Sequence, residues 1–185
     1  MSAFTTRTEI KIDTAHAELI RGLVIAHKPK ILLELGVGGG KSVDATLSAL
    51  NFNQQTYDYT LVDNWLDFGG TIPPEVTALY QDKLNIVTSA EKDFVLNCKK
   101  TFDYIMSDAD HQQSHTWFEH VYNNLLNPGG ILIYHDVNMF DLQAYPGLRE
   151  IYQKCQSTNK SHFLFNKNSL PDERCQRGLL VIFKN

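Results

Sequence analysis

The sequence is short of the features that mark secreted, membrane-spanning and nucleic-acid-binding proteins. Its 185 residues include three cysteines, Cys98, Cys155 and Cys175, an odd number at wide spacings without a pattern. We therefore expect reduced cytosolic thiols with no redox role. No apolar run is long enough to cross a bilayer, and the first residues contain no apolar segment typical of a secretory signal. These absences predict a cytoplasmic protein without a membrane partner.

An excess of basic residues is also absent. The formal net charge is −4, and lysine and arginine are scattered rather than clustered. This argues against nucleic acid as a partner. The length is sufficient for one domain with a full hydrophobic core. We find no internal repeat, so the sequence predicts a single domain over residues 1–185.

Short apolar runs alternate with longer amphipathic segments along the chain. Strands are expected over 30–35, 59–63, 85–89, 102–108, 131–136, 161–166 and 178–184. Helices are expected over 14–27, 42–51, 73–84, 90–100, 114–126 and 147–156. This alternation predicts an α/β fold, a doubly wound and mainly parallel sheet of about seven strands. The last two strands have no helix between them, so we expect them to pair as an antiparallel C-terminal hairpin.

Polar residues occupy the carboxyl ends of five of the predicted strands. They are Glu34, Asp63, Ser89, Asp108 and the pair His135–Asp136. In open α/β sheets, ligands bind at this edge. The pattern therefore predicts a ligand site built from several strand ends.

The loop "ELGVGGGKS" joins the first strand to the following helix. Glycines there let the backbone approach a ligand closely, and the helix N-terminus favours a negative group. A nicotinamide cofactor would call for G-x-G-x-x-G, but the third position is Lys41. The pattern is instead E-x-G-x-G-x-G. A plain tight turn is the simpler alternative.

Two acidic residues narrow the choice of ligand. The carboxylate of Glu34 suits a cationic partner such as an amino-acid ammonium group and would repel a pyrophosphate. Asp63, 23 residues after Gly40, is spaced to accept hydrogen bonds from a ribose diol. Together they predict a ligand in which an amino acid is joined to a nucleoside.

Three sequence blocks now support a family resemblance. "LELGVGGGKS", "FDYIMSDADH" and "NPGGILIYHDV" occur in the order and at the separation typical of class I S-adenosylmethionine-dependent methyltransferases. The sequence resembles the small metal-dependent O-methyltransferases of the caffeoyl-CoA and catechol type, and a related group with "DAxH" and "HD" signatures. The resemblance covers about residues 14–138. It implies a Rossmann-like sheet and S-adenosylmethionine as cofactor.

The resemblance implies a role for individual residues. Ser42 would help to hold the methionine carboxylate, Asp63 would hold the ribose, and Ala90 and Glu91 would flank the adenine. Glu34 would lie by the methionine part. The whole implied cofactor set is Glu34, Gly36, Gly38, Gly40, Ser42, Asp63, Ala90, Glu91 and Asp108.

The resemblance also implies a divalent metal, Mg or another available ion, beneath the acceptor. Asp108 would be a ligand, and His135 and Asp136 stand where the plant and catechol enzymes have Asp and Asn ligands. His111 stands at the place of a lysine thought to take the acceptor proton. A neutral imidazole suits that task near pH 7. Alternatively, Asp108 only shapes the pocket, and Asp110 caps the following helix or the turn. The base is alternatively Asp110 or His135 rather than His111.

Other aromatic and histidine residues receive simpler interpretations. Trp65 either packs in the core or walls the pocket near the adenine. Met139, Phe140 and Tyr145 are expected in an acceptor-facing loop. We expect no role for His115 and His120, and surface positions for His16, His27 and His162.

The sequence as a whole predicts a methyltransferase acting on a small hydroxylated acceptor with the help of a metal. One alternative is a subunit that binds the cofactor or a partner protein without catalysis. A nicotinamide-dependent oxidoreductase and an aminopropyltransferase are further alternatives, the first disfavoured by Lys41 and Glu34. The partner is a small molecule, and a homodimer is permitted without being specified.

Overall fold

The computed structural model describes residues 14–38, 40–80, 84–137, 145–166 and 178–185. Within this part of the chain, seven strands form one sheet in the order β3-β2-β1-β4-β5-β7-β6. The strands are β1 (Ile31–Leu35), β2 (Asp58–Asp63), β3 (Asn85–Thr88), β4 (Phe102–Ser107), β5 (Leu126–His135), β6 (Ser161–Phe165) and β7 (Leu179–Phe183).

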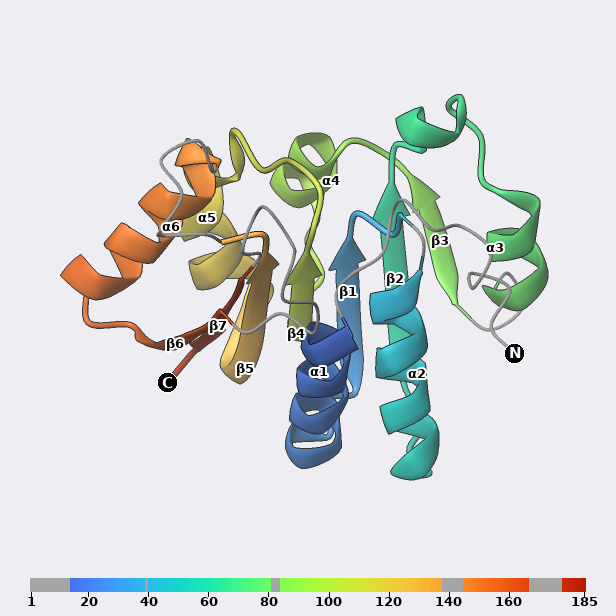
Figure 1. Ribbon diagram of the computed structural model, residues 1–185, viewed down its shortest axis with the longest axis horizontal. Helices are drawn as coiled ribbons and strands as arrows, with labels where there is room; N and C mark the ends of the chain where they lie inside the picture. Colours follow the sequence, from blue (N-terminus) through green and yellow to red (C-terminus); the bar gives the residue numbers. More distant parts are fainter. Residues whose placement is uncertain (1–13, 39, 81–83, 138–144, 167–177) are drawn as a thin grey trace.

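The first five strands run parallel to one another (Figure 1). β7 inserts beside β5 and pairs antiparallel with it, and β6 pairs antiparallel with β7 at the sheet edge. The predicted architecture, a mainly parallel sheet with an antiparallel C-terminal hairpin, is therefore confirmed. Two strands without an intervening helix have no crossover that would make them parallel.

Helices cover both faces of the sheet. On one face lie α1 (Thr14–His27), α2 (Lys41–Phe52) and α3 (Pro74–Tyr80), and on the other α4 (Glu91–Asn97), α5 (Phe118–His120) and α6 (Pro146–Ser157). Each face has its own core cluster of buried apolar side chains. Among the described residues, we find no helix with the length and apolar character needed to cross a membrane.

The segment predicted as one helix over 114–126 is instead a series of short turns. Around α5 lie the 3₁₀ turn η3 (Ser114–Thr116) and the π turn η4 (Val121–Leu125), and β5 begins directly afterwards. The backbone leaves the helical conformation at Trp117, with φ −112° and ψ 5°. The indole N–H of Trp117 donates to the buried carboxylate of Glu91 at 3.2 Å. A tertiary contact thus overrides the helical pattern of the local sequence.

Alternation along the strands decides which face each polar strand end meets. Glu34 follows Leu32 in β1, and His135 follows Ile133 in β5. Leu32 and Ile133 both belong to the core cluster beneath α1 and α2. Because successive side chains point to opposite faces, Glu34 and His135 also point toward the α1–α2 face. This orientation brings His135 under α1.

Candidate active site

A cavity of about 580 Å³ lies at the carboxyl ends of the parallel strands. Its lining comes from the glycine loop, from the ends of β2 and β5, and from the segments that follow β3 and β4. The lining includes Gly36, Gly38, Gly40, Ser42, Asp63, Ala90, Glu91, Asp108, His111, Asp136 and Tyr145. The structure thus gathers in one cavity most of the residues that the sequence nominated. Glu34 and His135 are nominated residues outside this lining.

The glycine loop turns directly against the end of β4. Gly36 has φ +82°, and a Cβ atom at this position would lie 2.4 Å from the carbonyl oxygen of Asp108. The N–H of Gly36 donates to Val62 at 2.8 Å, and the N–H of Asp108 donates to Leu35 at 2.8 Å. Only glycine fits this close approach without moving backbone. The loop is therefore more than a plain tight turn, because it joins two strand ends of the cavity.

Asp63 ties the glycine loop to the end of β2. One carboxylate oxygen accepts the N–H groups of Val37 at 2.8 Å and Gly38 at 3.2 Å. The other accepts the N–H of Trp65 at 2.7 Å. A carboxylate has about four acceptor lone pairs, so these three bonds leave one, on the oxygen bonded to Trp65, for a ligand in the cavity. The carboxylate is both anchored and placed on the cavity wall.

Glu34 lies beneath the loop rather than in the cavity. Its side chain is fully buried, and it accepts hydrogen bonds from the hydroxyls of Ser42, at 2.5 Å, and Tyr59. Burial raises the pKa of Glu34 to about 7, although these two hydrogen bonds oppose the rise. The sequence interpretation placed this carboxylate by a cationic ligand. In the structure it instead orients Ser42, which does line the cavity.

Glu91 lines the cavity, and its carboxylate is held by three hydrogen bonds within the protein. Its carboxylate accepts from Ser107 Oγ at 3.0 Å, from the N–H of Asp110 at 2.8 Å and from the indole of Trp117. Burial raises its pKa despite these bonds. Ala90, the exposed residue before α4, lies beside it on the cavity wall. Glu91 therefore anchors the loop after β4.

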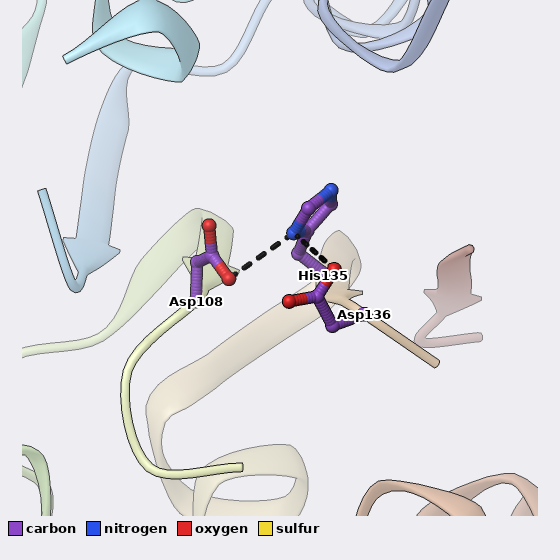
Figure 2. A group of neighbouring side chains, drawn as sticks. All are labelled: Asp108, His135 and Asp136. Atoms are coloured by element: carbon purple, nitrogen blue, oxygen red, sulfur yellow. Dashed lines mark hydrogen bonds and ion pairs between the residues drawn. The ribbon is translucent and has the colours of Figure 1, made fainter. Parts of the chain in front are cut away.

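Asp108, His135 and Asp136 converge at the ends of β4 and β5 (Figure 2). The Nδ1 atom of His135 lies 3.1 Å from Oδ1 of Asp108 and 3.1 Å from Oδ1 of Asp136. Burial alone would raise the pKa of Asp108. The charge of His135 and the hydrogen bonds from His111 and His135 hold it instead well below its usual range. Asp136 has φ +60°, a left-handed conformation that costs about 1–3 kcal/mol in a non-glycine residue.

These three residues fit a divalent cation. Their ligand atoms, one imidazole nitrogen and two carboxylate oxygens, all lie within 4.8 Å of one another. Ligand atoms at about 2.1–2.3 Å from a shared ion lie up to about 4.6 Å apart, so a small closure of the cluster would suffice. The mixed nitrogen and oxygen set suits first-row transition ions at least as well as Mg.

His111 lies at the cavity wall, beside Asp108. Its Nε2 atom is 3.0 Å from Oδ1 of Asp108, and its ring packs against that of Tyr145 at a tilt of 38°, with centroids 4.5 Å apart. Burial would lower the pKa of His111, but the hydrogen bond and charge of Asp108 raise it overall. Asp110 accepts the N–H groups of Gln112 and Gln113, at 3.0 and 2.9 Å. The prediction that Asp110 caps the turn is confirmed.

The structure decides the positions of Trp65 and His16, for which the sequence predicted either two alternatives or a surface position. Trp65 is fully buried in the core cluster and is absent from the cavity lining, which supports the core interpretation. His16 is also fully buried, so its predicted surface position is wrong. It was missed because histidine in a first helical turn is commonly exposed. Its spacing from Ile20 and Val24, which share the buried face of α1, was the available signal.

Other nominated residues lie at the margin of the site. Met139 and Phe140 fall outside the described residues, and Tyr145 follows them at the start of α6. His115 lies 3.6 Å from Glu150 on the far helix, and His120 bonds to the carbonyl of Val95. Both histidines are therefore engaged in local contacts, and neither is among the residues that line the cavity.

Comparison with known proteins gives a family match. A family model described as a methyltransferase domain matches residues 33–137. The comparison with curated proteins gave no match. The matched span begins in β1 and ends just after β5, so it contains the glycine loop, Asp63 and the Asp108–His135–Asp136 cluster.

Solved structures resemble the whole chain. The O-methyltransferase from Bacillus cereus in complex with SAH shares 17% identity and a TM-score of 0.77, over 99% of this chain and 87% of its own. A candidate caffeoyl-CoA O-methyltransferase from Staphylococcus aureus shares 21% identity with a TM-score of 0.74. The likeness covers 98% of this chain and 89% of the other. A third structure is TomG of Streptomyces achromogenes, an O-methyltransferase of tomaymycin synthesis in complex with SAM. It shares 13% identity with a TM-score of 0.70, and the likeness covers 97% of this chain and 84% of TomG. At these identities the likeness shows the fold.

Proposed function

Because the chain belongs to the methyltransferase-domain family matched over residues 33–137, we propose that it methylates the hydroxyl group of a small acceptor. The methyl donor in this proposal is S-adenosylmethionine, which is bound in TomG, a protein of the same fold. One observation carries the proposal: the glycine loop and the Asp108–His111–Asp136 wall face the same 580 Å³ cavity. A cofactor on the loop therefore places its reactive group beside residues able to activate a hydroxyl.

The cofactor would lie along the loop, with its parts assigned by chemistry. Gly36, Gly38 and Gly40 would expose the backbone on which the methionine part lies. The hydroxyl proton of Ser42 is donated to Glu34, so the backbone N–H of Ser42, in the first turn of α2, would hold the methionine carboxylate. Asp63 would accept a ribose hydroxyl with the lone pair that its backbone contacts leave on the oxygen bonded to Trp65. Ala90 and the backbone of Glu91 would flank the adenine.

A divalent cation would be held by Asp108, His135 and Asp136. When bound, the cation would stabilise the oxyanion of the acceptor. The three residues would also hold the acceptor oxygen near the cofactor loop, because the backbone of Asp108 lies directly against that of Gly36 in the loop. Positioning of this kind contributes several kcal/mol to methyl transfer.

His111 is the proposed base. Its Nε2 atom faces Asp108, which leaves Nδ1 to take the acceptor proton. The acceptor oxygen then forms a bond to the methyl carbon as the carbon–sulfur bond breaks. The bonding electrons remain on sulfur, giving the neutral thioether S-adenosylhomocysteine, and the proton ends on His111. A raised pKa makes His111 a stronger base, and Asp108 stabilises the cation that forms.

Calorimetric titration with S-adenosylmethionine tests the cofactor part of the proposal. We expect binding in the micromolar range that weakens at least about tenfold in Asp63→Ala. Asp67→Ala is the matched control, since Asp67 also lines the cavity. The titration is repeated with Mg²⁺, with Mn²⁺ and with a chelator. The absence of S-adenosylmethionine binding under every condition would refute the methyltransferase proposal, and tight competition by NAD would favour an oxidoreductase.

Turnover distinguishes an enzyme from a subunit that only binds the cofactor. A panel of small hydroxylated acceptors is incubated with the protein and labelled S-adenosylmethionine, and S-adenosylhomocysteine is measured with the methylated product. We expect product formation that depends on His111 and on a divalent ion. Cofactor binding without turnover over a broad panel would favour the non-catalytic alternative.

A further inference from the structure

His16 is a buried histidine without a role in the proposed chemistry. It lies in the first turn of α1, and its side chain is fully buried. Its ring meets the ring of Phe165 edge-on, with centroids 5.7 Å apart. α1 therefore carries a polar side chain into the sheet face beneath it. Burying an imidazole is costly unless its nitrogen atoms find partners.

The partner of His16 is one of the proposed metal ligands. Nδ1 of His16 lies 3.0 Å from Nε2 of His135, and both rings are buried. The two rings are nearly perpendicular, at 74°. The opposite nitrogen of His135, Nδ1, faces Asp108 and Asp136 at 3.1 Å each. His135 is thus held from both ends, by two carboxylates and by His16.

We propose that His16 is a positioning residue that orients His135 through this hydrogen bond and accepts a hydrogen bond from its Nε2–H group when Nδ1 binds a metal. The metal part of this inference rests on the proposed function. The orienting part rests on the contact alone. Since α1 lies outside the matched residues 33–137, this contact adds to the site a side chain from a segment outside the family model.

The tautomers of the two rings are linked. A hydrogen bond between two neutral imidazoles requires one nitrogen to donate and the other to accept. A metal at Nδ1 of His135 needs the lone pair of that nitrogen, so the proton of the neutral His135 ring would lie on Nε2. Nδ1 of His16 must then accept a hydrogen bond from this N–H, which requires the proton of the His16 ring to lie on its own Nε2. A buried donor without an acceptor is unfavourable, and partners of this kind fix the ligand tautomer in metal sites.

Three variants separate this role from simple packing. His16→Leu removes the hydrogen bond and keeps a side chain of similar volume. His16→Asn places an amide oxygen near the position of Nδ1 and restores an acceptor. His27→Asn makes the same change at a half-buried histidine of the same helix, as a matched control. Far-UV circular dichroism and thermal melting confirm that each variant is folded.

Titration with Mn²⁺, followed by the electron paramagnetic resonance signal of the free ion, measures metal affinity. We expect His16→Leu to weaken Mn²⁺ binding about 10- to 100-fold. His16→Asn should recover to within about threefold of the unmodified protein, and His27→Asn should match it. Wild-type affinity in folded His16→Leu would overturn the proposal.

Nitrogen NMR tests the contact without a metal. In the uniformly ¹⁵N-labelled protein, we expect a scalar coupling across the hydrogen bond between Nδ1 of His16 and Nε2 of His135. On addition of Zn²⁺, the proton should move to Nε2 of His135. Absence of the coupling in the metal-free protein would overturn the inference. A coupling in a protein that binds neither Zn²⁺ nor Mn²⁺ would support the orienting role and refute the metal part of the proposed function.

Discussion

Replacing Glu34 with glutamine should change how the stability of the protein depends on pH. Burial raises the pKa of Glu34 from its ordinary 4.5 to about 7, although Ser42 and Tyr59 donate hydrogen bonds to it. The folded protein therefore keeps this proton up to about pH 7, whereas the unfolded chain loses it near 4.5. Between these values the unfolded state binds fewer protons, so the free energy of unfolding falls as the pH rises.

The magnitude follows from the two pKa values. A rise from 4.5 to about 7 corresponds to about 3 kcal/mol, at about 1.4 kcal/mol for each tenfold change in the ionisation constant. This stability is fully present below pH 4.5 and is lost once the pH passes about 7. Glutamine does not ionise, so the free energy of unfolding of Glu34→Gln should not contain this fall. Relative to the unmodified protein, the variant should therefore gain about 3 kcal/mol between pH 4.5 and about 7. The corresponding loss in the unmodified protein is a large share of the total stability of a domain.

Urea unfolding at a series of pH values from 4.5 to 8 measures the effect. The free energies of unfolding are compared for the unmodified protein, Glu34→Gln and a control, Glu18→Gln, at an exposed position of α1. We expect the difference between the first two to grow with pH and the control to follow the unmodified protein. Parallel pH profiles for all three would refute the reasoning, because they would show that Glu34 is already ionised in the folded protein.

Four further predictions concern other parts of the site. Gly36→Ala should lower the free energy of unfolding by at least about 2 kcal/mol, since its Cβ would meet the carbonyl of Asp108, and should abolish calorimetric cofactor binding; an intact titration would contradict this. His111→Gln should slow turnover about 10²- to 10⁴-fold with little change in cofactor affinity. In the unmodified enzyme, kcat/KM should rise with pH through a pKa above 6.5, because Asp108 favours the protonated imidazole and the base must be neutral; a flat profile would exclude His111. Glu91→Ala should cost about 2–4 kcal/mol in urea unfolding by leaving the Trp117 indole without its acceptor, and a loss below about 0.5 kcal/mol would contradict the anchoring role.

Much of the fold could be predicted because the sequence pattern is local and regular. The hydrophobic runs predicted the strands. The absence of a helix between the last two strands predicted that they pair as an antiparallel hairpin, as the structure confirms. The resemblance to methyltransferases is confirmed by the family match. The convergence of Asp108 and Asp136 also followed from topology, since they end neighbouring parallel strands. Neighbouring parallel strands place their carboxyl ends at the same edge of the sheet, so residues at these ends lie close together even when they are far apart in the sequence.

The side-chain contacts of Glu34, His16 and Trp117 could not be predicted, because they depend on how distant parts of the chain pack against one another. Glu34 and Ser42 are eight residues apart, and no spacing rule indicates that the carboxylate would turn under the loop toward Tyr59. His16 lies 119 residues from His135, and their contact depends on how α1 crosses the sheet. The helix predicted over 114–126 is interrupted at Trp117, whose indole donates to the buried carboxylate of Glu91. Such choices are set by packing in three dimensions, which local sequence patterns do not contain.

The close approach at Gly36 has a consequence for how two ligands would influence each other. The loop that would carry the cofactor and the strand end that carries Asp108 touch through backbone atoms, with no side chain between them to absorb a displacement. A shift of one by a few tenths of an ångström must therefore shift the other. Occupancy of the loop should change the affinity at the Asp108 cluster, and thermodynamic reciprocity requires the same factor in the opposite direction. The strength of this coupling would then depend on this one contact, whichever ligand binds first.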